Sequence, residues 1–264
     1  MIRVVRDYIA GIYASRYFWW NLTLADLRFK YRRSYFGILW SIIQPLALTM
    51  LLSFVMGRFF HMPMRRMAPY IFVGMVTWDF VIGTTMNGCT ALLNSGCYIQ
   101  LFNHPMAIYT VRCTLSVFIN YLYAMIGVLA WSMIAFPRCI GLCYIAIVPA
   151  AMILFVCGWS LATMCAFAGV RFHDLPQFLV IILQMIWYMS PVFFPLEFFR
   201  DGGLSWLLNV NPVYHLLELF RSPLLDGVFP AWEHFAWSVG AAVYFWCVAV
   251  VFICCFERKT IYYV

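Results

Sequence analysis

The stretch CIGLCYIAIVPAAMILFVCGWSLATMCAFAGV, from Cys139 to Val170, contains no Lys, Arg, Asp or Glu. A helix that crosses the hydrocarbon core of a bilayer, roughly 30 Å thick, needs about 20 consecutive apolar residues. An α-helix also satisfies its own backbone hydrogen bonds where no water is present. The stretch therefore predicts a transmembrane helix, and the number of similar stretches decides the fold.

The whole chain has the composition of a membrane protein. Hydrophobic residues make up 65% of the sequence and charged residues 10%, whereas soluble proteins carry roughly 25% charged residues. The sequence predicts an all-α integral membrane protein of one domain with six transmembrane helices. Their expected ranges are 35–58, 69–93, 107–135, 141–170, 177–196 and 235–256.

The distribution of Lys and Arg predicts the orientation. Six crossings leave eleven Lys and Arg on the side of the N-terminus and six on the opposite side. Cytoplasmic loops carry the excess of these residues, so we expect both termini in the cytoplasm. The net charge of +7 then faces the membrane surface and does not indicate nucleic-acid binding. Because a long basic segment precedes the first span, we expect that span to act as the insertion signal.

The segment 16–33 has two apolar strips when it is placed on a helix at about 100° per residue. One strip holds Phe18, Leu22, Ala25 and Phe29, and the opposite strip holds Trp20, Leu24, Leu27 and Tyr31. Polar residues lie between the strips, with Asn21, Arg28 and Arg32 on one side and Asp26, Lys30 and Arg33 on the other. This predicts an amphipathic interfacial helix with lipid against one strip and protein against the other. The alternative is a basic flank that only fixes topology.

Two connections between the spans have a predicted structure. Gly, Asn and Pro residues interrupt the apolar pattern over 95–105, which predicts a cytoplasmic turn between the second and third spans. The outer segment 197–234 is too apolar for a solvated loop, and Asn211-Pro212 is typical of a helix start. We expect short re-entrant periplasmic helices there.

The sequence lacks a nucleotide-binding loop. Such a loop needs a Lys that follows Gly, and the two lysines, Lys30 and Lys259, follow other residues. If ATP drives this protein, a separate subunit binds ATP and Mg²⁺. We expect this chain to bind no cofactor and to be no enzyme.

Three groups of residues are candidates for a proton-transfer, metal-binding or catalytic site. Asp79 is the one carboxylate well inside a predicted span, where a charge costs on the order of 3 kcal/mol. It makes a structural polar contact or faces a pore, and a proton relay would need more ionisable residues at that depth.

Cys139 and Cys143 have a helical spacing that suits two metal ligands, but no His or carboxylate is near them, so no metal site is predicted. The outer carboxylates lack a pairing motif for acid–base catalysis; they are Glu197, Asp201, Glu218, Asp226 and Glu233.

Several motifs resemble those of the polysaccharide-exporting permeases of the type-2 ABC export class. The first is LRFKYRRS at 27–34, followed by Gly37, Trp40 and Gln44-Pro45. The later ones, in the expected order, are Arg171-Phe172-His173-Asp174-Leu175, Met189-Ser190-Pro191-Val192 with Pro195, and Asn211-Pro212. The turn Phe102-Asn103-His104-Pro105 departs from the family pattern, in which a basic residue is expected beside the aromatic-Pro pair.

The resemblance implies a homodimer joined to two copies of an ABC ATPase in the bacterial inner membrane. Its cargo would be a glycan on undecaprenyl diphosphate, such as O-antigen or capsule, moved from the cytoplasm to the periplasm. Other readings are an exporter of a teichoic acid precursor, a small lipid or a drug, and a membrane-embedded transferase that modifies lipid-linked sugars. A passive channel is disfavoured, because no span carries a filter pattern.

The resemblance also suggests roles for particular residues. The lipid headgroup would meet Arg28, Tyr31, Arg32 and Arg33, since cations attract a diphosphate at the membrane surface. The first and fifth spans would line the channel, where aromatic rings can pack on the C–H faces of sugars. The candidate channel residues are Tyr35, Phe36, Trp40, Asp79, Trp187, Tyr188, Phe193 and Phe194. The candidates for coupling to the ATPase are Phe102, Asn103, His104, Pro105, Arg171 and Asp174.

Overall fold

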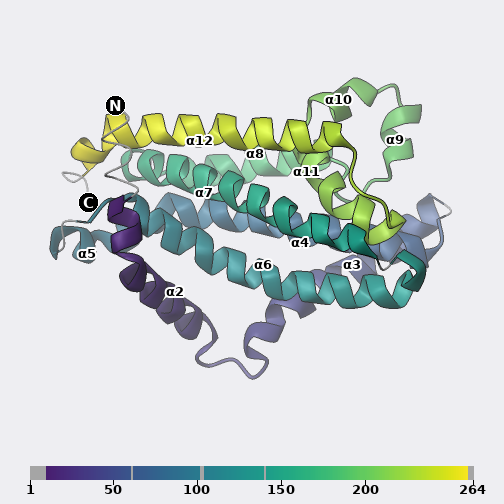
Figure 1. Cartoon of the computed structure of the whole chain (residues 1–264), viewed down its shortest axis with the longest axis horizontal. Helices are drawn as coiled ribbons and strands as arrows, with labels where there is room; N and C mark the ends of the chain where they lie inside the picture. Colours follow the sequence, from purple (N-terminus) through teal and green to yellow (C-terminus); the bar gives the residue numbers. More distant parts are fainter. Residues whose placement is uncertain (1–9, 61, 102–103, 140, 261–264) are drawn as a thin grey trace.

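A computed structural model describes residues 10–60, 62–101, 104–139 and 141–260, and over these ranges every regular element is a helix. The all-α membrane fold is thus confirmed (Figure 1). The α-helices with assigned bounds are α2 (Arg16–Tyr31), α3 (Trp40–Phe59), α4 (Met64–Ala91), α5 (Gly96–Leu101), α6 (Ala107–Ala135), α7 (Ile147–Arg171), α8 (Leu175–Met189), α9 (Leu196–Asp201), α10 (Ser205–Val210), α11 (Pro212–Arg221) and α12 (Trp232–Thr260). The short 3₁₀ or π segments are η1 (Gly37–Leu39), η2 (Leu93–Ser95), η3 (Pro137–Cys139), η4 (Leu142–Ala146) and η5 (Ser222–Asp226).

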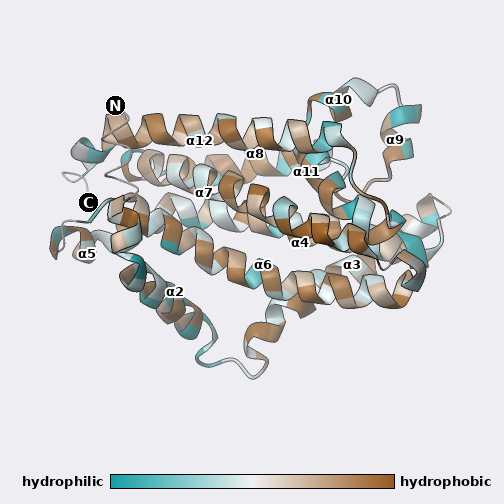
Figure 2. Ribbon diagram, viewed as in Figure 1, coloured by the Kyte–Doolittle hydropathy of each residue, from teal (hydrophilic) through white to brown (hydrophobic). Residues whose placement is uncertain are grey.

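Five helices in the described part of the chain are long and apolar enough to cross a bilayer. They cover Gly37–Phe59, Met64–Ala91, Ala107–Ala135, Leu142–Arg171 and Trp232–Glu257. Hydrophobic residues dominate these helices, whereas polar residues gather at the two ends of the bundle (Figure 2). The helix expected over 107–135 coincides with α6. By contrast, α4 begins before the expected residue 69, because Pro69 lies inside the helix and does not start it.

The helix expected over 177–196 is shorter than predicted. It ends as α8 at Met189, since Pro191 disfavours helical backbone at the preceding Ser190. The 15 residues of α8 rise about 22 Å, which is less than the thickness of the hydrocarbon core. The apolar chain continues beyond Ser190 without being helical until α9 begins.

Helix α4 forms the centre of the bundle. In its most apolar window 72% of the residues are buried, against 17% in the span that contains α3 and 11% in α12. It packs closely on α7 through small residues: a Cβ atom on Gly88 would lie 2.7 Å from the Cα of Ala162. Such close approach of two backbones is how membrane helices gain packing energy.

Many hydroxyl groups in the bundle bond within their own helix. Thr84, Thr114 and Ser160 each donate to the carbonyl four residues earlier, at 2.9, 2.9 and 2.7 Å. This arrangement satisfies a polar group without a partner from another helix. The two ends of the bundle differ, since α2 and α5 lie at one end and α9, α10 and α11 lie at the other (Figure 1).

Candidate functional site

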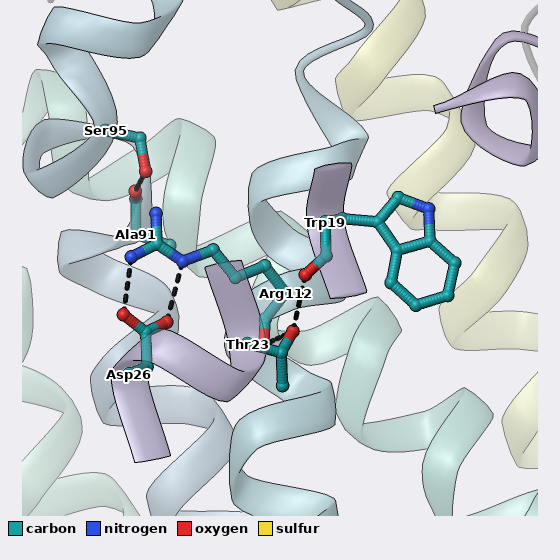
Figure 3. A network of polar contacts seen from close by, with 6 residues as sticks. All are labelled: Trp19, Thr23, Asp26, Ala91, Ser95 and Arg112. Carbon is teal, nitrogen blue, oxygen red and sulfur yellow. Dashed lines mark hydrogen bonds and ion pairs between the residues drawn. The ribbon is translucent and has the colours of Figure 1, made fainter. Parts of the chain in front are cut away.

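Helix α2 is joined to α6 by an ion pair. The Nε and Nη2 atoms of Arg112 donate to the two carboxylate oxygens of Asp26 at 2.7 and 2.5 Å (Figure 3). The hydroxyl of Thr23 donates to the carbonyl of Trp19 at 2.8 Å and lies 3.5 Å from the carbonyl of Arg112. The face of α2 that contacts the bundle is therefore partly polar.

The predicted apolar strips of α2 account for only part of this contact. Its buried residues are Thr23, which belongs to neither strip, and Leu27, which belongs to the strip of Trp20, Leu24, Leu27 and Tyr31. Trp20 of that strip and Phe29 of the other are 44% and 81% exposed. The protein side of the helix also includes the polar Asp26, because α6 supplies a cation for that carboxylate. A charge-assisted bidentate pair holds the helix in a way that an apolar strip does not predict.

Tyr31 holds the end of α2 against two other helices. Its hydroxyl donates to Oδ1 of Asn120 in α6 at 2.5 Å and lies 2.9 Å from the hydroxyl of Ser41 in α3. Among the proposed headgroup residues, Tyr31 thus uses its hydroxyl for hydrogen bonds within the protein. The remaining three, Arg28, Arg32 and Arg33, are exposed.

The connection between α2 and α3 presents aromatic side chains beside these arginines. Tyr35, Phe36 and Trp40 are all exposed, and the rings of Phe36 and Trp40 meet edge to face with centroids 5.6 Å apart. This connection lies outside the packed bundle (Figure 1). Basic and aromatic residues of the first motif therefore form one continuous exposed segment.

A polar cavity of about 340 Å³ lies between α2, α4 and α6. Asp26 and Arg112 form part of its wall. Its other polar lining residues include Lys30, Asn87, Thr90, Asn94, Tyr109, Ser116 and Asn120. The cavity lies on the side of α2 that faces the bundle.

Asp79 is an exposed residue in the middle of α4, between the buried Trp78 and Phe80. At about 100° per residue, it falls on the same side of α4 as Asn87 and Thr90, which line the cavity. No hydrogen bond joins its carboxylate to another of the residues that the structure describes. The polar side of α4 therefore continues from the cavity toward the middle of the helix.

The residues proposed for ATPase coupling lie at the end of the bundle that holds α2 and α5. His104 Nδ1 lies 3.3 Å from the hydroxyl of Ser15, and its ring is 5.0 Å from that of Phe18. Pro105 is half-buried, whereas Arg171 and Asp174 are exposed in the turn between α7 and α8. Phe102 and Asn103 lie outside the described residues.

The four aromatic residues proposed at the end of the fifth span form one cluster. The ring of Phe193 lies 4.9 Å from that of Trp187 and 4.1 Å from that of Phe194. Phe193 is buried in this chain, Trp187 and Phe194 are half-buried, and Tyr188 is 51% exposed. Tyr188 is thus the most accessible of the four.

Side chains from α4 and α11 hold the non-helical backbone after α8. The hydroxyl of Tyr70 donates to the carbonyls of Pro191 and Phe194 at 3.2 and 3.0 Å. Nη2 of the buried Arg221 donates to the carbonyl of Val192 at 2.9 Å, and its guanidinium stacks 3.6 Å from the ring of Tyr70. These contacts satisfy carbonyls that an unwound segment would otherwise leave unpaired.

Helix α11 begins as predicted and is joined to α12. Asn211 caps it by accepting a hydrogen bond from the amide of Val213 at 2.9 Å. In α11, His215 Nε2 lies 3.0 Å from the carbonyl of Asn209, so this nitrogen carries a proton. His215 Nδ1, 2.9 Å from His234 Nδ1, is then the acceptor when His215 is neutral.

The two cysteines considered as metal ligands contact the backbone of the segment after α11. Cys139 donates to the carbonyl of Leu225 at 3.4 Å and Cys143 to that of Gly227 at 3.0 Å. Among the described residues, no group of three His, Cys, Asp or Glu side chains is placed to hold a metal ion.

Sequence reasoning missed the contacts of Asp26, Arg112, Asn120 and Arg221. It assigned Arg112 and Arg221 only to the charge balance of the two membrane sides. One feature of the sequence could have indicated that Arg112 has a partner, because it is the single cation between two long uncharged stretches. Its partner is 86 residues away, a separation at which no local pattern indicates a contact.

The protein is a helical, multi-pass membrane protein with an oblique basic helix, α2, at one end and three short helices at the other, of which α11 is buried. The chain belongs to the ABC-2 type transporter family, whose profile matches residues 17–225. It is similar to an O-antigen export system permease protein, RfbA, of Klebsiella pneumoniae, with 23% identity over 78% of this chain and 80% of that protein. The RfbA of Myxococcus xanthus is 22% identical over 96% of both chains. The polysialic acid transport protein KpsM of Escherichia coli is 24% identical over 78% of this chain and 80% of that protein.

Proposed function

We propose that this chain is the membrane-spanning permease subunit of an ABC transporter that exports a polysaccharide from the cytoplasm. The observation that carries the proposal is the family match over residues 17–225 together with relatives named for O-antigen and polysialic acid transport. One of those relatives aligns over 96% of both chains, so the similarity extends over almost the whole of each chain.

The proposed cargo is a glycan attached to undecaprenyl diphosphate. The exposed Arg28, Arg32 and Arg33 support this, because each cation near an anionic membrane surface contributes about 1 kcal/mol of attraction. The neighbouring exposed rings of Tyr35, Phe36 and Trp40 suit contact with lipid and with the C–H faces of sugars. A lipid-linked diphosphate glycan has the negative charge, the lipid chain and the sugar C–H faces that these residues would contact.

The proposed assembly is a homodimer with two copies of a separate ABC ATPase in the bacterial inner membrane. Helices α3 and α8 both pack on α4 and leave most of their remaining surface open, which suits a channel between two copies. The end with α5 and the exposed Arg171 and Asp174 would meet the ATPase, which would bind ATP and Mg²⁺. In this arrangement α8 and the segment after it complete a sixth crossing, and both termini lie in the cytoplasm.

Neutralisation of two arginines tests the proposal. In cells that depend on this permease for surface glycan, the double substitution Arg28→Gln and Arg32→Gln should strongly reduce surface glycan at equal expression. The matched control is Arg58→Gln, which removes an exposed cation at the far end of α3 and should leave export unchanged. Normal export by the double variant would exclude an essential role of these arginines. Mass spectrometry of lipid that co-purifies with the complex would identify the cargo.

A further inference from the structure

The cavity between α2, α4 and α6 contains polar groups that lack partners. The Tyr109 side chain is 1% exposed, and its hydroxyl has no hydrogen-bond partner among the described residues. The side chains of Asn87 and Asn94 are exposed at the cavity and make no hydrogen bond with the described part of the protein. A buried polar group without a partner is costly, so the cavity requires water or a polar ligand.

The charges of the cavity favour an anion. Lys30 and Arg112 contribute two positive charges to its wall, and Asp26 contributes one negative charge. Two nitrogens of Arg112 are bonded to Asp26, and the third points away from that carboxylate (Figure 3). An ammonium group and a free guanidinium nitrogen are the donors that proteins use for phosphate.

The rest of the lining suits hydroxyl groups. The amides of Asn87 and Asn94 can each donate and accept a hydrogen bond, as can the hydroxyls of Thr90 and Ser116. The volume of about 340 Å³ lies within the range of small-molecule sites, roughly 300–1,000 Å³. The cavity thus has the size, the net charge and the donor set that fit one sugar and its phosphate.

We propose that this cavity binds a phosphate-linked sugar, with Lys30 and Arg112 facing the phosphate and Asn87 and Asn94 facing the sugar hydroxyls. The ligand is either the headgroup of a lipid-linked glycan, which rests on the proposed export function, or a soluble sugar phosphate. The site is separate from the exposed Arg28, Arg32 and Arg33, because it lies on the bundle side of α2. A lipid headgroup would meet those arginines first and the cavity afterwards.

Binding measurements on the permease with its ATPase partner in lipid nanodiscs test the site. The probes are undecaprenyl diphosphate that carries one N-acetylhexosamine, undecaprenol without a headgroup, and glucose 1-phosphate. The double substitution Asn87→Leu and Asn94→Leu should weaken binding of the sugar-diphosphate lipid at least about tenfold, since two hydrogen bonds are lost. Binding of undecaprenol should not change. Lys30→Gln, at an exposed position, should also weaken binding of the lipid.

The control is Asn21→Leu, which removes an exposed amide of α2 outside the cavity and should bind like the wild type. Binding of glucose 1-phosphate that depends on Asn87 and Asn94 would support the site and identify a soluble source of the ligand. Wild-type affinity for the lipid in both cavity variants would overturn the site and leave the export function standing. Absence of glycan export by the wild-type permease would instead overturn the export function.

Discussion

Arg112 in α6 and Asp26 in α2 form a bidentate ion pair between residues 86 positions apart in the chain. Their side chains are 17% and 35% exposed, so water reaches the pair but does not surround it. Helix α2 has only two buried residues, which makes this pair a large part of what fixes its position. The position of α2 in turn shapes the polar cavity.

Asp26→Asn should loosen α2. The substitution removes the negative charge that Arg112 pairs with and should lower the free energy of unfolding by about 1–2 kcal/mol. Hydrogen exchange should rise in α2 and stay unchanged in α7. The reversed pair, Asp26→Arg with Arg112→Asp, should restore part of the protection. Equal exchange of α2 in the wild type and in Asp26→Asn would contradict this role of the pair.

Tyr31→Phe separates two roles for the tyrosine hydroxyl. The loss of its bonds to Asn120 and Ser41 should cost about 1 kcal/mol of stability, measured as a lower unfolding temperature. If Tyr31 only positions α2, the affinity for undecaprenyl diphosphate should remain unchanged. A clear loss of affinity without loss of stability would make it a headgroup ligand. Tyr244→Phe, at an exposed tyrosine of α12, is the control.

Gly88→Ala should disturb the packing of α4 on α7. The added Cβ atom would lie 2.7 Å from the Cα and 2.8 Å from the carbonyl oxygen of Ala162, so two backbones must separate. Overpacking of this kind costs about 1–3 kcal/mol. Gly240→Ala in α12 is the matched control, because nothing lies within 4 Å of its added Cβ atom. Thermal unfolding in detergent should distinguish the two variants, and equal unfolding temperatures would refute the packing argument.

Glu218 in α11 should make stability depend on pH. Burial raises the pKa of its carboxyl above the ordinary value, against the opposing effect of the Arg221 charge. The folded protein then binds the proton more tightly than the unfolded chain does, so stability is greatest at low pH and falls as pH rises through the raised pKa. Glu218→Gln removes the ionisable group and should unfold at a higher temperature than the wild type at neutral pH. The difference should shrink toward about pH 4.3, the ordinary glutamate value, and a constant difference at all pH values would argue against this origin.

The long helices could be predicted because a sufficiently long apolar stretch is enough to predict a membrane-spanning helix. The apolar stretch expected at 107–135, in which Arg112 is the one charged residue, became α6 with the same bounds. The length of an apolar segment does not predict where its helix ends if the backbone leaves the helical conformation within the segment, as it does at Ser190. Hydropathy cannot distinguish helical from unwound backbone. The carbonyls of the unwound segment are bonded by Tyr70 and Arg221, which lie far from it in sequence.

The candidate site was predicted less completely. The sequence motif indicated Arg28, Arg32 and Arg33 as candidates for headgroup binding, and all three are exposed and so accessible to a ligand. The polar contacts of α2 with the bundle were missed because they depend on Arg112 and Asn120, which α6 brings to the helix only in the folded chain. The cavity has contributors from three helices, and no single segment carries a motif for it.

The hydroxyls that bond within their own helices bear on how the chain enters the membrane. Thr84, Thr114 and Ser160 have their acceptors as soon as their own helices form, so insertion by the translocation machinery need not wait for a neighbour. Arg221 differs, because a buried cation needs hydrogen-bond acceptors and those of Arg221 are the carbonyls of Tyr70 and Val192. Both acceptors precede Arg221 in the chain and so leave the ribosome earlier. The order of synthesis thus delivers this arginine to partners that have already been made.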